Sequence, residues 1–103
     1  MVTPTFEVLA EPNRRRILDL LRESERPVGE LVAALDVSQP TVSKHLRVLR
    51  DSGLVAVRSD AQRRLYRLRP EPLRAIDTWL APYRVLWAAR LDDLERHLDE
   101  MPD

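Results

Sequence analysis

Apolar residues recur at helical spacing through the first third of the chain. In residues 28–35 they occupy the first, fourth, fifth and eighth positions, which make one complete helical face. A similar stripe predicts a helix from Asn13 to residue 23, preceded by a proline that can open it. A shorter apolar pattern predicts a helix over residues 5–10, and residues 24–27 form a polar break. We therefore expect three helices before residue 36.

A fourth helix is predicted over residues 39–51. Ser38 is well placed as its N-cap, since a serine hydroxyl can accept a hydrogen bond from an early backbone N–H. Pro40 is tolerated in the first turn, and Gly53 stops the helix. The spacing i, i+4 and i+7 predicts a buried stripe made of Val42, Leu46 and Leu49.

The pattern then changes to that of strands. Within residues 54–57, Val55 and Val57 fall on one side of an extended chain, as do Tyr66 and Leu68 within residues 65–68, and this alternation predicts a β-hairpin. The polar stretch between them, residues 58–64, is expected to form a mobile, basic tip. Two prolines end the hairpin and open a long helix over residues 73–99. The predicted fold is mainly α with a small β-hairpin, in the order α-α-α-α-β-β-α. This is the winged helix-turn-helix plan, built as a single domain over residues 1–103.

Charge is distributed unevenly, although the net charge is zero. Residues 38–69 carry eight basic residues against two acidic ones, whereas the segments on both sides are acidic. Such a block produces a local field that attracts a polyanion. The chain contains no cysteine, so thiolate metal sites and thiol redox sensing are excluded.

Several classes of protein do not fit the sequence. No Ser-His-acid arrangement is supported by the spacing, so we expect no enzymatic activity. No stretch approaches the roughly 18 apolar residues of a membrane span, and no signal peptide pattern opens the chain. We therefore expect a cytoplasmic protein that needs no cofactor.

The exposed face of the predicted fourth helix has the side chains of a DNA-reading helix. Glutamine can pair with adenine, serine can bond to any base, and lysine and arginine reach guanine or phosphate. An ordinary solvated face is equally compatible with this helix alone, and the basic hairpin that follows favours DNA. The predicted contacts with double-stranded DNA are Gln39, Pro40, Thr41, Ser43, Lys44 and Arg47 on the helix and Arg58, Arg63 and Arg64 on the hairpin. The alternative is a winged-helix module that binds an acidic protein and has only non-specific DNA affinity.

The last predicted helix carries an apolar stripe too long for one small domain to cover. Its early turns are expected to join the core, and Pro82 is expected to kink or divide it. We predict a homodimer interface made of Phe6, Leu9, Leu80, Tyr83, Trp87, Leu91, Leu94 and Leu98. A ligand pocket around the aromatic residues is a less favoured alternative, because aromatic stripes more often form core or interface.

Residues 6–69 resemble the ArsR family of bacterial winged-helix repressors. The resemblance is carried by LAEPNRRRILDLL, GELVAALDVSQPTVSKHLRVLRDSGLV and RRLYRL. It implies a homodimeric repressor on an inverted repeat, often at its own promoter, with the first and last helices forming the dimer. The base-reading positions that it implies are Gln39, Pro40, Ser43 and Lys44.

The chain departs from that family at three places. The metal-sensing cysteine motif of many members corresponds here to residues 30–36, which hold no cysteine. Asp93 and His97 have a spacing able to hold a metal, but a single histidine on a charged helix is better read as solvated or ion-paired, so no metal site is expected. Ala61 and Gln62 stand where the wing often has a glycine. An organic effector and no effector at all both remain open.

Overall fold

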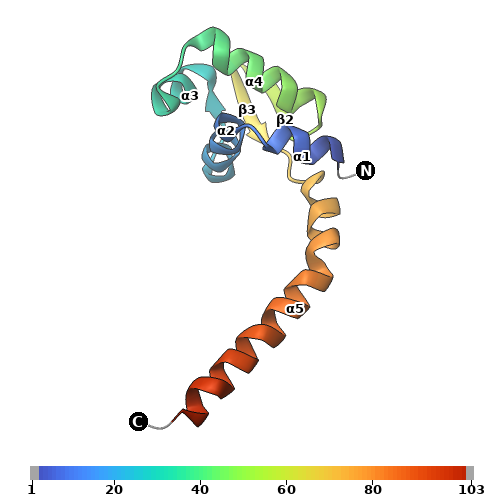
Figure 1. Cartoon of the computed structure of the whole chain (residues 1–103). Helices are drawn as coiled ribbons and strands as arrows, with labels where there is room; N and C mark the ends of the chain where they lie inside the picture. Colours follow the sequence, from blue (N-terminus) through green and yellow to red (C-terminus); the bar gives the residue numbers. More distant parts are fainter. Residues whose placement is uncertain (1–2, 102–103) are drawn as a thin grey trace.

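The computed structural model describes residues 3–101, which form a small body and one long helix that projects from it (Figure 1). The dimensions along the principal axes are 66 × 33 × 22 Å, so the molecule is elongated. The elements in chain order are α1 (Thr3–Leu9), α2 (Pro12–Glu23), β1 (Arg26–Pro27), α3 (Val28–Leu35), α4 (Gln39–Asp51), β2 (Val55–Asp60), β3 (Arg63–Leu68) and α5 (Leu73–Glu100).

The helices of the body follow the apolar pattern closely. The limits of α3 and α4 are those expected, and α2 begins with Pro12 at its first turn. Gly53, just after α4, has φ 78°, a conformation that glycine adopts without strain. The first helix begins at Thr3 rather than residue 5, since Pro4 is compatible with a first turn.

The sheet has three strands rather than the two of the predicted hairpin. The segment that was expected to be a polar break contains the two-residue strand β1, which pairs antiparallel with β3, and the strand order is β1-β3-β2. The expectation was wrong because two residues are too short to show alternation. The sequence nevertheless fits an edge strand, since Pro27 lacks the N–H that a central strand would need.

The wing, residues 55–68, is more regular than expected. Strand β2 extends to Asp60 and β3 begins at Arg63, so the predicted mobile tip reduces to a turn made of Ala61 and Gln62. Ala61 adopts φ 57°, where glycine would be favoured. The register pairs Val55 with Leu68, so the predicted apolar alternation is confirmed.

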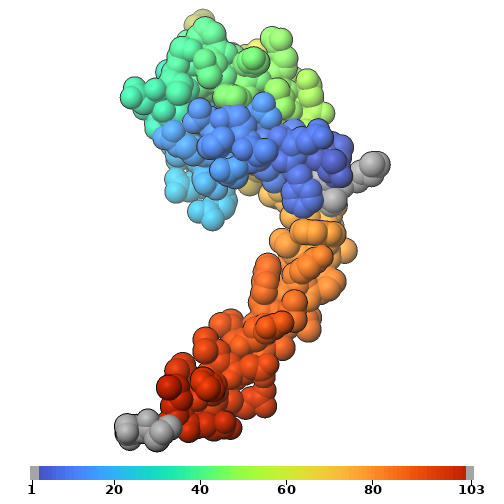
Figure 2. All heavy atoms as spheres, viewed as in Figure 1, coloured from blue at the N-terminus to red at the C-terminus, as the bar shows by residue number. Residues whose placement is uncertain are grey.

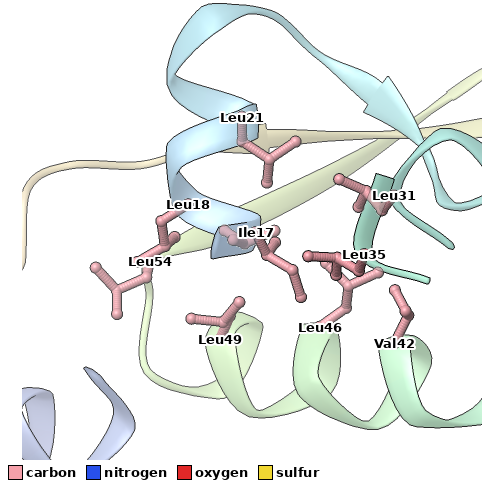
Figure 3. Packing of buried hydrophobic residues seen from close by; sticks show 10 residues of the cluster. Ile17, Leu18, Leu21, Leu31, Leu35, Val42, Leu46, Leu49 and Leu54 are labelled. Atoms are coloured by element: carbon pink, nitrogen blue, oxygen red, sulfur yellow. The ribbon is translucent and has the colours of Figure 1, made fainter. Parts of the chain in front are cut away.

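The core lies where α2, α3 and α4 meet the start of the wing (Figure 3). The predicted stripe of α4 is fully buried and packs with the apolar faces of α2 and α3. The buried cluster consists of Ile17, Leu18, Leu21, Leu31, Leu35, Val42, Leu46, Leu49, Leu54 and Val55. This packing fixes α4 with its opposite face toward solvent.

The last helix, α5, projects away from the body (Figure 2). None of its residues is buried, and only its first turns touch the body, with Leu73 packed against the core. Pro82 does not divide it: the helix is continuous for 28 residues and bends along its length (Figure 1). Within residues 3–101, no helix combines the length and apolar character needed to cross a membrane.

Candidate nucleic-acid interface

The start of α4 is held by the cap that the sequence predicted. The Ser38 hydroxyl accepts a hydrogen bond from the Thr41 backbone N–H at 3.3 Å. It also lies 2.8 Å from the Thr41 hydroxyl. Thr41 is half-buried, so the structure gives its side chain a capping role. A DNA contact by Thr41 stays a prediction.

The other predicted residues of α4 lie together on its exposed face. Lys44 and Arg47 are both exposed and enter none of the ion pairs found among residues 3–101. Because no carboxylate neutralises them, both cations are available to an external anion. The exposed set is Gln39, Pro40, Ser43, Lys44 and Arg47.

A polar cluster attaches α4 to the beginning of α2. His45 points away from solvent, with 12% of its side chain exposed, and its Nε2 lies 3.4 Å from the Glu11 carboxylate. Arg14 Nε donates to His45 Nδ1 at 3.3 Å, so the imidazole hydrogen is assigned to Nε2. The Glu11 carboxylate also caps α2 by accepting from the Asn13 N–H at 3.0 Å. The structure therefore gives His45 a packing role between the two helices.

The three predicted wing arginines differ in what they contact. Arg58 donates to both oxygens of Glu25, at 2.8 and 3.2 Å, in a two-pronged ion pair. This hydrogen bonding holds the pKa of Glu25 below its ordinary value and raises that of Arg58. Arg63 lies 3.7 Å from the Asp60 carboxylate. Arg64 enters no ion pair or side-chain hydrogen bond with another residue of the described chain.

The sequence alone could not rank these arginines. Glu25 is 33 residues away from Arg58, and the strand β1 that brings it near the wing was not predicted. In the structure, Arg58 connects the half of strand β2 nearer the turn to the segment before β1. Arg64 remains the freest cation of the three.

A second surface lies on α5, far from α4. The predicted apolar stripe is exposed from Tyr83 to Leu98, and Leu80 is half-buried. Near the body, the Phe6 ring packs edge-on against the Trp79 ring, with 5.6 Å between the ring centroids. The centroids of the Trp79 and Tyr83 rings lie 5.0 Å apart. The aromatic part of α5 therefore joins α1 in one apolar surface, which continues along the helix.

The charged residues around the predicted Asp93 and His97 spacing form no metal cluster in the structure. Asp93 accepts a hydrogen bond from Arg96 on the same helix. Within the described part of the chain, no three histidine, aspartate or glutamate side chains come together in a metal-binding group.

Comparisons with known proteins agree with this geometry. Residues 11–57 match the family described as bacterial regulatory protein, arsR family. The chain is 37% identical over 98 residues to the HTH-type transcriptional regulator Rv2034 of Mycobacterium tuberculosis, an alignment that covers 95% of this chain and 89% of the relative. It is 47% identical over 71 residues to the SmtB repressor of the same organism, which covers 69% of this chain and 53% of SmtB. The chain thus spans about half the length of SmtB.

A solved structure leads to the same family. The ArsR family transcriptional regulator RHA00566 superposes with a TM-score of 0.72 at 32% identity, covering 84% of this chain and 90% of that one. The chain therefore belongs to the ArsR family, a family of DNA-binding transcriptional regulators, and has the winged helix-turn-helix fold.

Proposed function

We propose that the protein represses transcription as a homodimer bound to an inverted-repeat operator. The observation that carries the proposal is the exposed polar and cationic face of α4. In each half-site this face enters the major groove, which is wide enough to admit a helix. The wing then lies over the adjacent minor groove. Repression follows because the bound dimer occupies DNA that polymerase needs.

The contacts of α4 divide into base reading and phosphate binding. Gln39 and Ser43 lie one turn apart and can bond to base edges, while Lys44 and Arg47 can reach guanine or phosphate. The opposite face of the helix is fully buried, which holds its orientation. Such a helix loses little conformational entropy when it binds DNA, because its backbone and orientation are already fixed in the free protein.

The homodimer is supported by the apolar surface of α5. Leucines at 91, 94 and 98 are each more than half exposed, and no part of the described chain covers them. A second copy of the same stripe offers a matching apolar surface across a two-fold axis. Two linked α4 helices then bind half-sites whose centres lie about 34 Å apart. Bivalency raises the affinity for the palindrome without any new contact.

The test is binding to the DNA immediately upstream of the protein's own gene, measured by fluorescence anisotropy against a scrambled duplex. We expect the upstream DNA to bind at least about tenfold more tightly, a difference of about 1.4 kcal/mol. Replacing Lys44 or Arg47 with alanine should weaken this binding by about 5- to 150-fold for each half-site that loses the contact.

The matched control is Arg22→Ala. Arg22 is an exposed arginine in the last turn of α2, outside α4 and the wing. The Arg22→Ala variant should bind the upstream DNA with the same affinity as the parent. Equal affinity of the parent, Lys44→Ala and Arg47→Ala proteins would show that α4 is not the reading helix. Equal, weak binding to both duplexes would favour a protein partner or a remote operator.

A further inference from the structure

A hollow of about 380 Å³ separates the first turns of α4 from the wing. One wall is formed by Gln39 and Ser43, which lie one helical turn apart on α4. Pro27, Val28 and Arg63 also line the hollow, and its opposite wall includes Gln62, Arg64 and Tyr66. These three alternate along the turn and β3, so they lie on the same face of the wing.

The position of the hollow matters for any duplex that the protein binds as proposed above. A major groove and the adjacent minor groove are separated by one sugar-phosphate strand. If α4 occupies the first groove and the wing lies over the second, that strand has to pass between them. The hollow is the space that the structure leaves there, and polar side chains line both of its walls.

Arg64 has the properties of a phosphate ligand within this hollow. It is exposed, and no carboxylate of the described chain pairs with it, in contrast to Arg58 and Arg63. A guanidinium suits phosphate because its fork of N–H donors matches two phosphate oxygens.

Tyr66 supplies a second donor beside it. Its ring is half-buried and packs against the core, which fixes the side chain. Every buried side-chain nitrogen or oxygen atom of the described chain has a hydrogen-bond partner. The Tyr66 hydroxyl has no such partner among the described residues, so it is not buried. The Tyr66 hydroxyl therefore reaches solvent, and the hollow is the surface that Tyr66 lines. Residues two apart on a strand lie about 7 Å apart, so both side chains can converge on one phosphate.

We propose that the DNA strand between the two grooves passes through the hollow, and that Arg64 and Tyr66 bind one of its phosphates together. Arg64 donates through its guanidinium, and Tyr66 donates its hydroxyl hydrogen. This inference rests on the proposed DNA binding by α4 and the wing. It makes Tyr66 a positioning residue that sets the register of the protein on DNA without reading a base.

Because a phosphate contact is independent of sequence, the test needs no operator. The probe is a fluorescein-labelled 24-base-pair duplex of arbitrary sequence, and anisotropy is measured from 20 to 200 mM KCl. For Arg64→Gln we expect weaker binding and a log–log salt slope shallower by about two, because the dimer loses one cationic phosphate contact in each of its two copies. For Tyr66→Phe we expect about tenfold weaker binding with an unchanged slope, since the lost donor is uncharged.

Three comparisons make the test decisive. Arg22→Gln removes an exposed arginine outside the hollow and should leave the slope unchanged. Tyr66→Phe keeps the packed ring, so an unchanged thermal midpoint separates the lost contact from a folding defect. The double variant should lose less affinity than the product of the two single losses, because both residues bind one phosphate.

The outcomes distinguish this inference from the proposed function. If the parent binds the duplex but Arg64→Gln and Tyr66→Phe bind like Arg22→Gln, the phosphate site is wrong while DNA binding stands. If the single losses multiply in the double variant, the two residues do not share a phosphate and the proposal is overturned. If the parent fails to bind at 20 mM KCl, the proposed function and this inference fall together.

Discussion

Replacing Leu91 and Leu94 with glutamate should separate the proposed dimer into single chains. The two leucine side chains are 65% and 53% exposed in one copy. Full burial of a leucine contributes about 1.5–3 kcal/mol, so covering these exposed fractions contributes about 1–2 kcal/mol for each side chain. Four such side chains meet in a symmetric dimer, which gives about 4–7 kcal/mol. The dimer should therefore dissociate about 10³- to 10⁵-fold more readily, and the buried charges add to the effect.

Sedimentation velocity at micromolar concentration measures the association state directly. The parent should sediment as a dimer of 12.0 kDa chains and the double variant as a monomer. The matched control is Ala89→Glu with Arg96→Gln, which changes the net charge by the same two units. Helical spacing places both control positions on the side of α5 opposite the stripe, so this variant should stay dimeric. A monomeric parent, or a glutamate variant that remains dimeric, would refute the reasoning.

Two further predictions concern the wing. Ala61→Gly should raise the unfolding free energy by up to about 1 kcal/mol, because glycine adopts the positive φ of this turn without strain. The greater conformational freedom of glycine in the unfolded chain offsets part of this gain. A lower thermal midpoint of the variant would contradict the prediction. Glu25→Gln should lower stability at neutral pH by breaking the Arg58 pair. Since the pKa of Glu25 is lowered in the folded state, its contribution is present above the ordinary glutamate value of about 4.3 and is lost as the pH falls through the folded pKa. The thermal midpoint of Glu25→Gln should therefore be lower than that of the parent at pH 7, and the two midpoints should converge at strongly acid pH. An equal difference between the midpoints at both pH values would assign the effect to packing.

Hydrophobic periodicity predicted much of the fold because each helix of the body buries one face. The stripe of α4 and the alternation that pairs Val55 with Leu68 are local patterns, and the structure confirms both. The cap at Ser38 was predictable for the same reason, since its partner Thr41 is three residues away. Features that depend on near neighbours in the sequence were therefore accessible without the structure.

Features that depend on distant segments were missed. Strand β1 is defined by its pairing with β3, about 40 residues later, and its two residues have no period of their own. The pairing of Arg58 with Glu25 and the hollow beside Arg64 arise only after the sheet has formed. Pro82 is a local feature that was expected to kink or divide the last helix, and the structure shows the first of these alternatives, because α5 bends and continues through it.

The central claim is that the exposed face of α4 reads a specific inverted repeat. Selection of binding duplexes from a randomised 40-base-pair library, followed by sequencing, tests it most directly. The account predicts enrichment of one inverted repeat whose half-site centres lie about 10 base pairs apart, and loss of this enrichment in the Lys44→Ala, Arg47→Ala double variant. A library that stays unenriched with the parent, or the same repeat enriched by the double variant, would contradict it.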